Sequence, residues 1–163
     1  MTIEEKKTAG PILVAIDFSV DSAAALAWAV RYAERSGQRL VLLHVVHEPA
    51  SRPGFYRNSK QDLLQPMETV AREMMNQFLQ PLLQEEFSQT LGHADRLFVP
   101  GLPPTRIVEV AELLDADSIV VGSRGRTGLP PVLLGSVAER VVELAQCPVV
   151  VVTSRRKDKD TEK

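Results

Sequence analysis

Short apolar runs alternate with helical repeats along the chain of 163 residues, and no other feature constrains the fold as strongly. The runs are short enough for buried strands, and between them apolar residues recur every three or four positions, as on one face of a helix. The connections are too long for hairpins, so the strands should run parallel with helical crossovers. The expected strands are 12–17, 40–46, 97–100, 118–121 and 149–153. The expected helices are 23–35, about 61–90, 103–114 and 137–145, and Pro81 should kink or divide the second of them.

This alternation predicts an α/β protein, a Rossmann-like three-layer sandwich with helices on both faces of a five-stranded parallel sheet. The length suits one domain, which we place at 11–154. We expect residues 1–10 to form a flexible N-terminus and residues 155–163 a disordered charged tail. The connection 47–60 carries two prolines and a glycine and is expected to be the least regular internal segment.

Composition excludes several functional classes. The formal net charge is −2, so no global field draws the chain to nucleic acid or to an anionic membrane surface. No apolar run approaches the roughly 18 residues of a transmembrane helix, and the polar start of the chain is unlike a secretory signal. The single cysteine, Cys147, excludes an internal disulfide, and His44 and His47 would point to opposite faces of one strand. We therefore expect a cytoplasmic protein without nucleic-acid or membrane partners and without a His or Cys metal site.

A glycine-rich stretch follows the fourth expected strand. Gly122, Gly125 and Gly128 interrupt the apolar pattern, and Gly135-Ser136 opens the last expected helix. Glycine lets backbone N–H groups approach a ligand, and the first N–H groups of a helix attract anions. Ligands of open parallel sheets bind beyond the carboxyl ends of the strands, at the point where the strand order reverses. The stretch therefore predicts a phosphate cradle that faces the same crevice as Asp17, at the end of the first strand.

Two common nucleotide motifs do not fit the chain. The Walker A loop needs a Gly-Lys pair, which the sequence lacks, and the dinucleotide fingerprint needs three glycines after the first strand, where the chain has Asp17 to Ser22. The spacing is instead Gly122-x2-Gly125-x9-Gly135-Ser136, which closely resembles the ATP-binding signature of the universal stress protein family, Gly-x2-Gly-x9-Gly-Ser/Thr. The resemblance covers about residues 10–154. The chain departs from it inside the spacer, where Leu129-Pro-Pro131 stiffens the loop at unchanged length.

Three further landmarks occur in the order that the family shows: Leu42-Leu-His-Val45 at the end of the second strand, Gly101 after the third, and Cys147-Pro-Val149 before the fifth. Family members with the intact signature commonly bind ATP or AMP. The resemblance implies that the phosphates and ribose are held by Gly122, Gly125, Gly135, Ser136 and Val137. It implies that the adenosine is bordered by Ala15, Ile16 and Asp17. It also implies that the Val45 backbone pairs with adenine. The predicted site further includes Gly101, Val121, Ser123 and Arg124.

Several of these residues have a second interpretation that needs no ligand. Ser136 and Glu139 fit a Ser-x-x-Glu capping box, whereas the Ser136 hydroxyl would otherwise donate to a phosphate. Asp17 either orients the turn after its strand or binds ribose hydroxyls or a phosphate-bound Mg²⁺. Arg124 and Arg126 either clamp phosphates with their guanidinium groups or are solvated loop residues. The sequence alone leaves these alternatives open.

The run Val149–Val152 is β-branched and uncharged and comes last in the expected sheet. An exposed edge strand of this kind invites pairing with another chain. Universal stress proteins usually dimerise through their last strand, so the resemblance implies a homodimer that pairs Val149–Thr153 across a two-fold axis. The alternative is a strand that is fully covered within a monomer.

We expect a universal stress protein that binds ATP or AMP with Mg²⁺ and acts as a nucleotide-dependent regulatory module in a stress response. The chain offers no obvious Ser–His–Asp set and no Walker lysine, so any ATP hydrolysis should be slow. One alternative is an ATP-using transferase or pyrophosphatase on a related α/β fold. Another is a nucleotide-free dimeric interaction protein that holds partners with its 47–60 connection. The residues do not identify a protein client.

Overall fold

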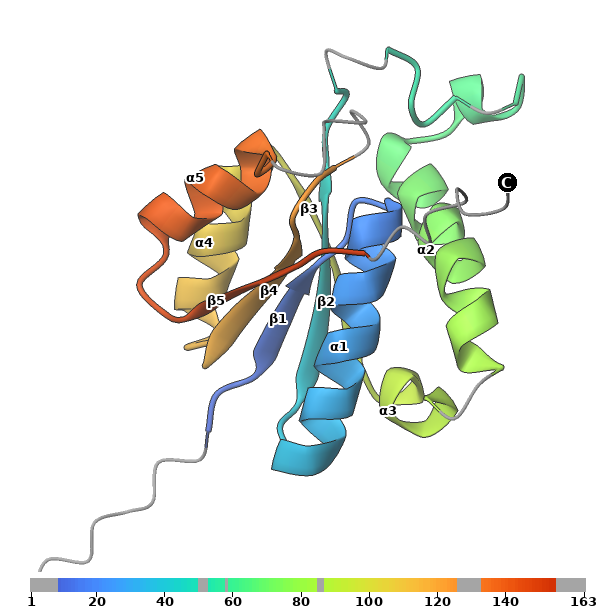
Figure 1. Cartoon of the computed structure of the whole chain (residues 1–163). Helices are drawn as coiled ribbons and strands as arrows, with labels where there is room; N and C mark the ends of the chain where they lie inside the picture. Colours follow the sequence, from blue (N-terminus) through green and yellow to red (C-terminus); the bar gives the residue numbers. More distant parts are fainter. Residues whose placement is uncertain (1–8, 50–52, 58, 85–86, 126–132, 155–163) are drawn as a thin grey trace, which may run out of the picture.

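A computed structural model describes residues 9–49, 53–57, 59–84, 87–125 and 133–154 (Figure 1). All strand pairs are parallel, and the strand order is β3-β2-β1-β4-β5, so the predicted α/β class and parallel sheet are confirmed. The strands are β1 (Ile12–Ala15), β2 (Leu40–Val46), β3 (Asp95–Pro100), β4 (Ser118–Gly122) and β5 (Val149–Val152). The helices in the described ranges are α1 (Val20–Ser36), η1 (Asp62–Leu64, a 3-10 helix), α2 (Met67–Leu83), α3 (Ser88–Gly92), α4 (Pro103–Leu113) and α5 (Ser136–Leu144).

The helices cover the two faces of the sheet as separate groups (Figure 1). On one face, α1, α2 and α3 pack around a core that includes Leu26, Met75 and Leu91. On the other face, α4 and α5 contribute Ile107 and Val141 to a second core. The strands between them carry apolar side chains on both sides, as strands of a fully covered parallel sheet do. The predicted three-layer sandwich is therefore confirmed.

The strand order reverses at β1, which lies between β2 and β4. Ala15 is in register with Leu43, and Val14 with Val120, so the carboxyl ends of these three strands meet at one edge. The chain leaves β1 toward α1 on one face and leaves β4 toward α5 on the other (Figure 1). This divergence opens the crevice in which sheets of this kind bind ligands. The first strand ends at Ala15, so Asp17 lies in the turn at that crevice.

Local capping sets both ends of α1. The Ser19 hydroxyl oxygen accepts a hydrogen bond of 3.1 Å from the Ser22 N–H, which satisfies one of the free donors of the first turn. Gly37 closes the helix with φ 70° and donates its N–H to the Ala33 carbonyl. The predicted stop at Gly37 is confirmed. The helix begins at Val20, earlier than expected, because the cap lies at Ser19.

The segment predicted as one helix over 61–90 contains three elements, η1, α2 and α3. Pro81 was expected to kink or divide the helix, and division at Pro81 is wrong, because α2 continues through Pro81 to Leu83. A proline removes the hydrogen bond to the carbonyl four residues earlier. Only Leu82 and Leu83 follow Pro81 in α2, so the loss is confined to the last turn and the helix ends beyond the proline.

Some predictions concern residues outside the described ranges and stay predictions. They are the flexible start over 1–8, the tail over 155–163, Arg126, Gly128 and the Leu-Pro-Pro segment 129–131. The domain boundaries at 11 and 154 also stay predictions. Within the ranges that are described, no helix is long and apolar enough to cross a membrane.

Candidate functional site

A cavity of about 590 Å³ opens at the carboxyl ends of β1, β2 and β4, where the strand order reverses. All residues of the predicted site except Gly101 line this cavity: Ala15, Ile16, Asp17, Val45, Val121, Gly122, Ser123, Arg124, Gly125, Gly135, Ser136 and Val137. They come from segments that are far apart in the sequence. The structure therefore brings the glycine loop, the end of the first strand and the start of α5 to one place.

Gly101 lies in the turn from β3 into α4 and is absent from the cavity lining. Its φ of 137° belongs to the region that favours glycine, and a Cβ there would lie 2.5 Å from Arg106 Nε. Arg106 Nε donates to the Pro100 carbonyl, which fixes the guanidinium against this turn. Gly101 thus accommodates Arg106, and the next two residues, Leu102 and Pro103, reach the cavity.

Three side chains that sequence analysis did not assign form a wall of the cavity, which we call the aromatic wall: His44, Phe55 and Tyr56. His44 is buried, with Nδ1 2.7 Å from the Ile16 carbonyl oxygen and Nε2 2.8 Å from the Tyr56 hydroxyl. A neutral ring satisfies both contacts when Nδ1 donates to the carbonyl and Nε2 accepts from the hydroxyl. Phe18, at φ 65°, stacks on His44 with ring centroids 4.4 Å apart. The sequence signal for two of these side chains was the adjacent aromatic pair Phe55-Tyr56 in the otherwise polar connection 47–60.

The backbone of Val45 faces the crevice just past the end of β1. Ile12 and Ile16 donate their N–H groups to the carbonyls of Arg39 and Leu43, so alternate residues of β2 present their peptide groups to β1. Val45 continues this series beyond the last β1 residue. His47 Nδ1 lies 3.2 Å from the Val45 carbonyl oxygen. A carbonyl oxygen can accept two hydrogen bonds, so a ligand donor could share it with the His47 ring.

Two glycines of the loop allow close contact within the protein. A Cβ on Gly122 would lie 2.7 Å from the carbonyl carbon of Asp21 and 2.9 Å from Ser22 N, so β4 and the first turn of α1 touch through bare backbone. A Cβ on Gly135 would lie 3.1 Å from the Ser123 carbonyl oxygen, which also accepts the Gly135 N–H at 2.7 Å. The sequence predicted these glycines to let a ligand approach closely. The structure shows that packing within the protein also requires glycine at both positions.

The Asp17 side chain orients the turn after β1, as one of its two interpretations predicts. Its Oδ1 accepts a hydrogen bond of 2.9 Å from the Ser19 N–H and shapes the turn that leads into α1. A Cβ on Gly125 would lie 3.1 Å from Asp17 Oδ2, so the carboxylate lies against the glycine loop. A ligand contact of Asp17 is compatible with this position and stays a prediction.

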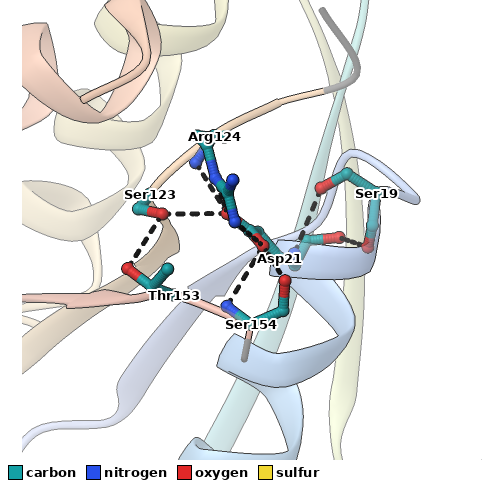
Figure 2. Close-up of polar contacts among 7 residues, drawn as sticks. Ser19, Asp21, Ser123, Arg124, Thr153 and Ser154 are labelled. Atoms are coloured by element: carbon teal, nitrogen blue, oxygen red, sulfur yellow. Dashed lines mark hydrogen bonds and ion pairs between the residues drawn. The ribbon is translucent and has the colours of Figure 1, made fainter. Parts of the chain in front are cut away.

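Asp21 is the hub of a buried polar network that joins three segments (Figure 2). Its Oδ2 accepts hydrogen bonds from Ser123 Oγ at 2.8 Å, from the Arg124 N–H at 3.1 Å and from Arg124 Nε at 3.0 Å. Its Oδ1 accepts from Arg124 Nη2, the Ser154 N–H and the Ser154 hydroxyl, while Thr153 donates to Ser123 Oγ. The Arg124 side chain is 6% exposed, so the interpretation as a solvated residue is wrong. A phosphate contact of Arg124 stays a prediction.

The capping-box interpretation of Ser136 is wrong. α5 begins at Ser136 itself, and its N-cap is Gly135, which has no side chain to cap the first turn. The Glu139 N–H bonds the Gly135 carbonyl at 2.9 Å, as the first regular bond of the helix. The Ser136 hydroxyl therefore has no capping role and lies on a residue that lines the cavity.

The sequence is similar to those of known proteins. The sequence model of the universal stress protein family matches residues 9–153. The chain belongs to the universal stress protein family. It is 32% identical over 143 residues to universal stress protein YxiE of Bacillus subtilis, covering 86% of this chain and 97% of that one.

Solved universal stress proteins share the fold. UspA from Lactobacillus plantarum superimposes with a TM-score of 0.67 at 28% identity, over 88% of this chain and 97% of that one. A universal stress protein from Archaeoglobus fulgidus in complex with dAMP superimposes with a TM-score of 0.59, over 88% of this chain and 97% of that one. At 23% identity the second likeness shows the fold alone.

In this universal stress protein, Asp21 supports the site from outside the cavity lining, and sequence reasoning did not identify it. An acidic residue in the first turn of a helix is ordinarily explained by the helix dipole. The partner Ser123 lies 102 residues away in the sequence. The glycine spacing indicated the loop but gave no sign of what holds it.

The pKa of Asp21 reflects two opposing effects. Burial alone would raise it, but the hydrogen bonds from Ser154, Arg124 and Ser123 favour the carboxylate more strongly and lower the pKa from 3.8 to about 2. The Asp21 network is therefore charged throughout the physiological range.

Burial raises the pKa of the Cys147 thiol, which disfavours the thiolate form.

The lowered pKa predicts an acid-sensitive contribution to stability. A carboxyl whose pKa falls on folding stabilises the native state fully above pH 3.8 and loses this contribution as the pH drops toward 2; the shift corresponds to about 2 kcal/mol. In Asp21→Asn, the decrease in unfolding free energy between pH 6 and pH 3 should be smaller than in the wild type by about 1 kcal/mol, measured by urea denaturation. Asp95→Asn, which removes an exposed carboxylate paired with Arg39, is the control. An unchanged pH dependence in Asp21→Asn would contradict the assignment.

The close contact at Gly122 predicts a stability defect. Gly122→Ala would force α1 and β4 apart and should lower the unfolding free energy by about 2 kcal/mol or more, even without ligand. Gly92→Ala is the matched control, because a Cβ on Gly92 meets nothing within 4 Å. Chemical denaturation of both variants measures the difference. Equal unfolding free energies of Gly122→Ala and Gly92→Ala would contradict the prediction, because they would show that the loop relaxes to accept the added methyl group.

Proposed function

We propose that this universal stress protein binds ATP or AMP in the cavity at the carboxyl ends of β1, β2 and β4 and acts as a nucleotide-dependent regulatory module. The observation that carries the proposal is the convergence on one cavity of apolar side chains, the loop 122–125 and the N-terminus of α5. The volume of about 590 Å³ falls within the range of about 300–1,000 Å³ that small-molecule sites occupy. The same fold holds dAMP in the Archaeoglobus fulgidus protein.

The base end of the site would lie at the end of β2. Val45 supplies the peptide N–H and C=O that a purine edge can pair with, and Ala15 and Phe55 supply apolar surface. The Val45 carbonyl oxygen already lies 3.2 Å from His47 Nδ1. Its second lone pair can accept a hydrogen bond from the base, so pairing does not require the His47 contact to break.

The phosphate end would lie at the glycine loop and the start of α5. The first N–H groups of a helix have no partner within it, and Ser136, Val137 and Ala138 all line the cavity. The Ser136 hydroxyl adds a donor that capping does not consume. Because Asp21 holds the Arg124 guanidinium, backbone groups would provide most of the anion binding, and Mg²⁺ would be held by the phosphates near Asp17.

The proposal includes slow hydrolysis at most, a cytoplasmic location and a protein client that responds to the bound state. No lysine occurs among the described residues that line the cavity. Formation of AMP and pyrophosphate at about 1–10³ s⁻¹ would instead indicate the transferase or pyrophosphatase alternative. A complete lack of nucleotide binding would favour the interaction protein.

Isothermal titration calorimetry tests the binding site directly. ATP should bind saturably with a Kd below about 1 mM, and Ser136→Ala should weaken ATP about five- to ten-fold without changing adenosine, because the hydroxyl serves only the phosphates. Ser88→Ala is the matched control, since Ser88 also opens a helix, α3, and does not line the cavity. No saturable ATP binding by the wild type would remove the proposal. An equal loss of ATP and adenosine in Ser136→Ala would remove the assigned role of the hydroxyl.

We also propose a homodimer that pairs β5 with β5 of a second copy. β5 is an edge of the sheet, and its four valines are half-buried. Ile119 and Ser123 donate to the carbonyls of Pro148 and Val152, so the even-numbered residues of β5 bond to β4. By the alternation of a parallel ladder, the peptide groups of Val149 and Val151 face away from the sheet. These groups match what a second edge strand needs.

A proline at this edge tests the dimer. Val151→Pro would remove an outward N–H while leaving the bonds to β4 intact, so it should shift the protein toward monomer in sedimentation velocity experiments. Val151→Thr keeps the N–H and a similar shape and should keep the oligomeric state. A dimer that survives Val151→Pro, or a monomeric wild type, would contradict pairing at β5.

A further inference from the structure

We propose that Asp21 is a positioning residue for the phosphate end of the site, and that through it Ser154, just past the end of β5, sets how tightly the glycine loop holds an anion. The inference rests on the proposed nucleotide function and adds a control point to it. Neither residue is part of the Gly-x2-Gly-x9-Gly-Ser signature. Both lie outside the cavity lining.

Asp21 fixes the interior of the glycine loop. It is the second residue of α1 and is 4% exposed, so its carboxylate is held by the rigid first turn of a capped helix. Ser123 and Arg124 are the two residues between Gly122 and Gly125, and both donate to Asp21 Oδ2 (Figure 2). The glycines themselves have no side chains to anchor the loop. The Asp21 carboxylate therefore anchors both side chains of the loop interior.

The other oxygen of the carboxylate holds the C-terminal end of β5. Asp21 Oδ1 accepts the Ser154 N–H at 3.1 Å and the Ser154 hydroxyl, and Arg124 Nη2 at 3.3 Å. A second link runs in parallel, because Thr153 Oγ1 donates to Ser123 Oγ at 3.0 Å. A shift of the strand end would thus reach the loop through two side-chain contacts.

Ser123 transmits the same constraint to α5. Its carbonyl accepts the N–H of Gly135, the N-cap of α5, at 2.7 Å, and its own N–H donates to the Val152 carbonyl at 2.8 Å. The loop, the start of α5 and the end of β5 are therefore held relative to one another. Both groups of backbone donors proposed for the phosphates belong to this unit, whereas Val45, proposed for the base, belongs to β2.

The energetic cost of breaking these hydrogen bonds favours coupled movement of the end of β5 and the glycine loop over independent movement of either. A buried carboxylate that loses donors pays a desolvation cost, so it moves with its remaining partners or takes on water. Loss of the Ser154 hydroxyl removes one of the three donors to Oδ1 and leaves the Ser154 N–H at 3.1 Å and Arg124 Nη2 at 3.3 Å. Binding of an anion by fixed donors requires placement to within about 0.5 Å, so a small displacement is enough to weaken it.

Hydrogen–deuterium exchange without ligand tests the structural half of the proposal. Ser154→Ala and Asp21→Asn should each accelerate exchange at Ser123 and Gly135 by about ten-fold, with the amides of β1 and β2 unchanged. Asp95→Asn, at the opposite end of the strands, should leave these amides unchanged. Exchange that stays at the wild-type rate in Ser154→Ala would overturn the coupling, and this milder variant decides the result if Asp21→Asn does not fold.

Calorimetric titrations with ATP and adenosine test the functional half. Both variants should weaken ATP about ten-fold and leave adenosine unchanged, and Ser154→Thr, which restores a hydroxyl, should recover most of the ATP affinity. Equal weakening of both ligands, or no weakening, would overturn the positioning role. If wild-type protein binds neither ligand, the proposed function fails and the role in affinity with it, while the exchange experiment still decides whether Ser154 and the loop are coupled.

Discussion

The close approach of α1 to the carboxyl end of β4 is the constraint on which the site depends. Gly122 allows this approach because a side chain there would collide with the backbone of Asp21 and Ser22. The contact brings the Asp21 carboxylate within hydrogen-bond distance of the following loop residues. It also fixes one wall of the crevice relative to the sheet. A glycine that sequence patterns associate with ligands thus first serves the packing of a helix on a strand.

The buried Asp21–Arg124 pair changes the electrostatic character of the loop. Arg124 brings a positive charge to a region proposed to bind phosphates, but the neighbouring carboxylate compensates it at 3.0 Å. Two charges in a poorly hydrated environment are tolerated when each is hydrogen-bonded, and Asp21 receives bonds from three residues. The pair orders the loop without leaving an excess charge in it. Anion recognition then relies on the direction of peptide N–H groups.

The overall architecture could be predicted from the sequence because periodicity and connection length determine it. Every strand of the sheet was anticipated, with shifts of a few residues at the ends, as was the stop at Gly37. Division of the helix at Pro81, one of the two outcomes expected there, was wrong because a proline in a final turn costs only a local bond. The alternative interpretation of Ser136 as a helix cap was wrong because Gly135 takes that position. Both errors come from local sequence rules, one for prolines in helices and one for helix caps, that more than one backbone geometry can satisfy.

The site was predictable in outline and not in its supporting contacts. Glycine spacing located the loop, and the strand order located the crevice. The contact between Asp21 and Ser123 depends on the packing of α1 against β4, and local sequence carries no record of it. The same holds for His44, whose partner Tyr56 is delivered by an irregular connection.

The origin of the aromatic wall has a consequence for how such a site can diversify. Phe55 and Tyr56 come from a surface connection, whereas the loop after β4 is fastened to α1 and β5. Substitutions in the connection can therefore reshape one side of the cavity while the anchored loop keeps its geometry. Related chains can therefore change which ring the cavity accommodates and still bind the charged end of the ligand at the loop. This is possible because separate stretches of the gene encode the two parts of the cavity.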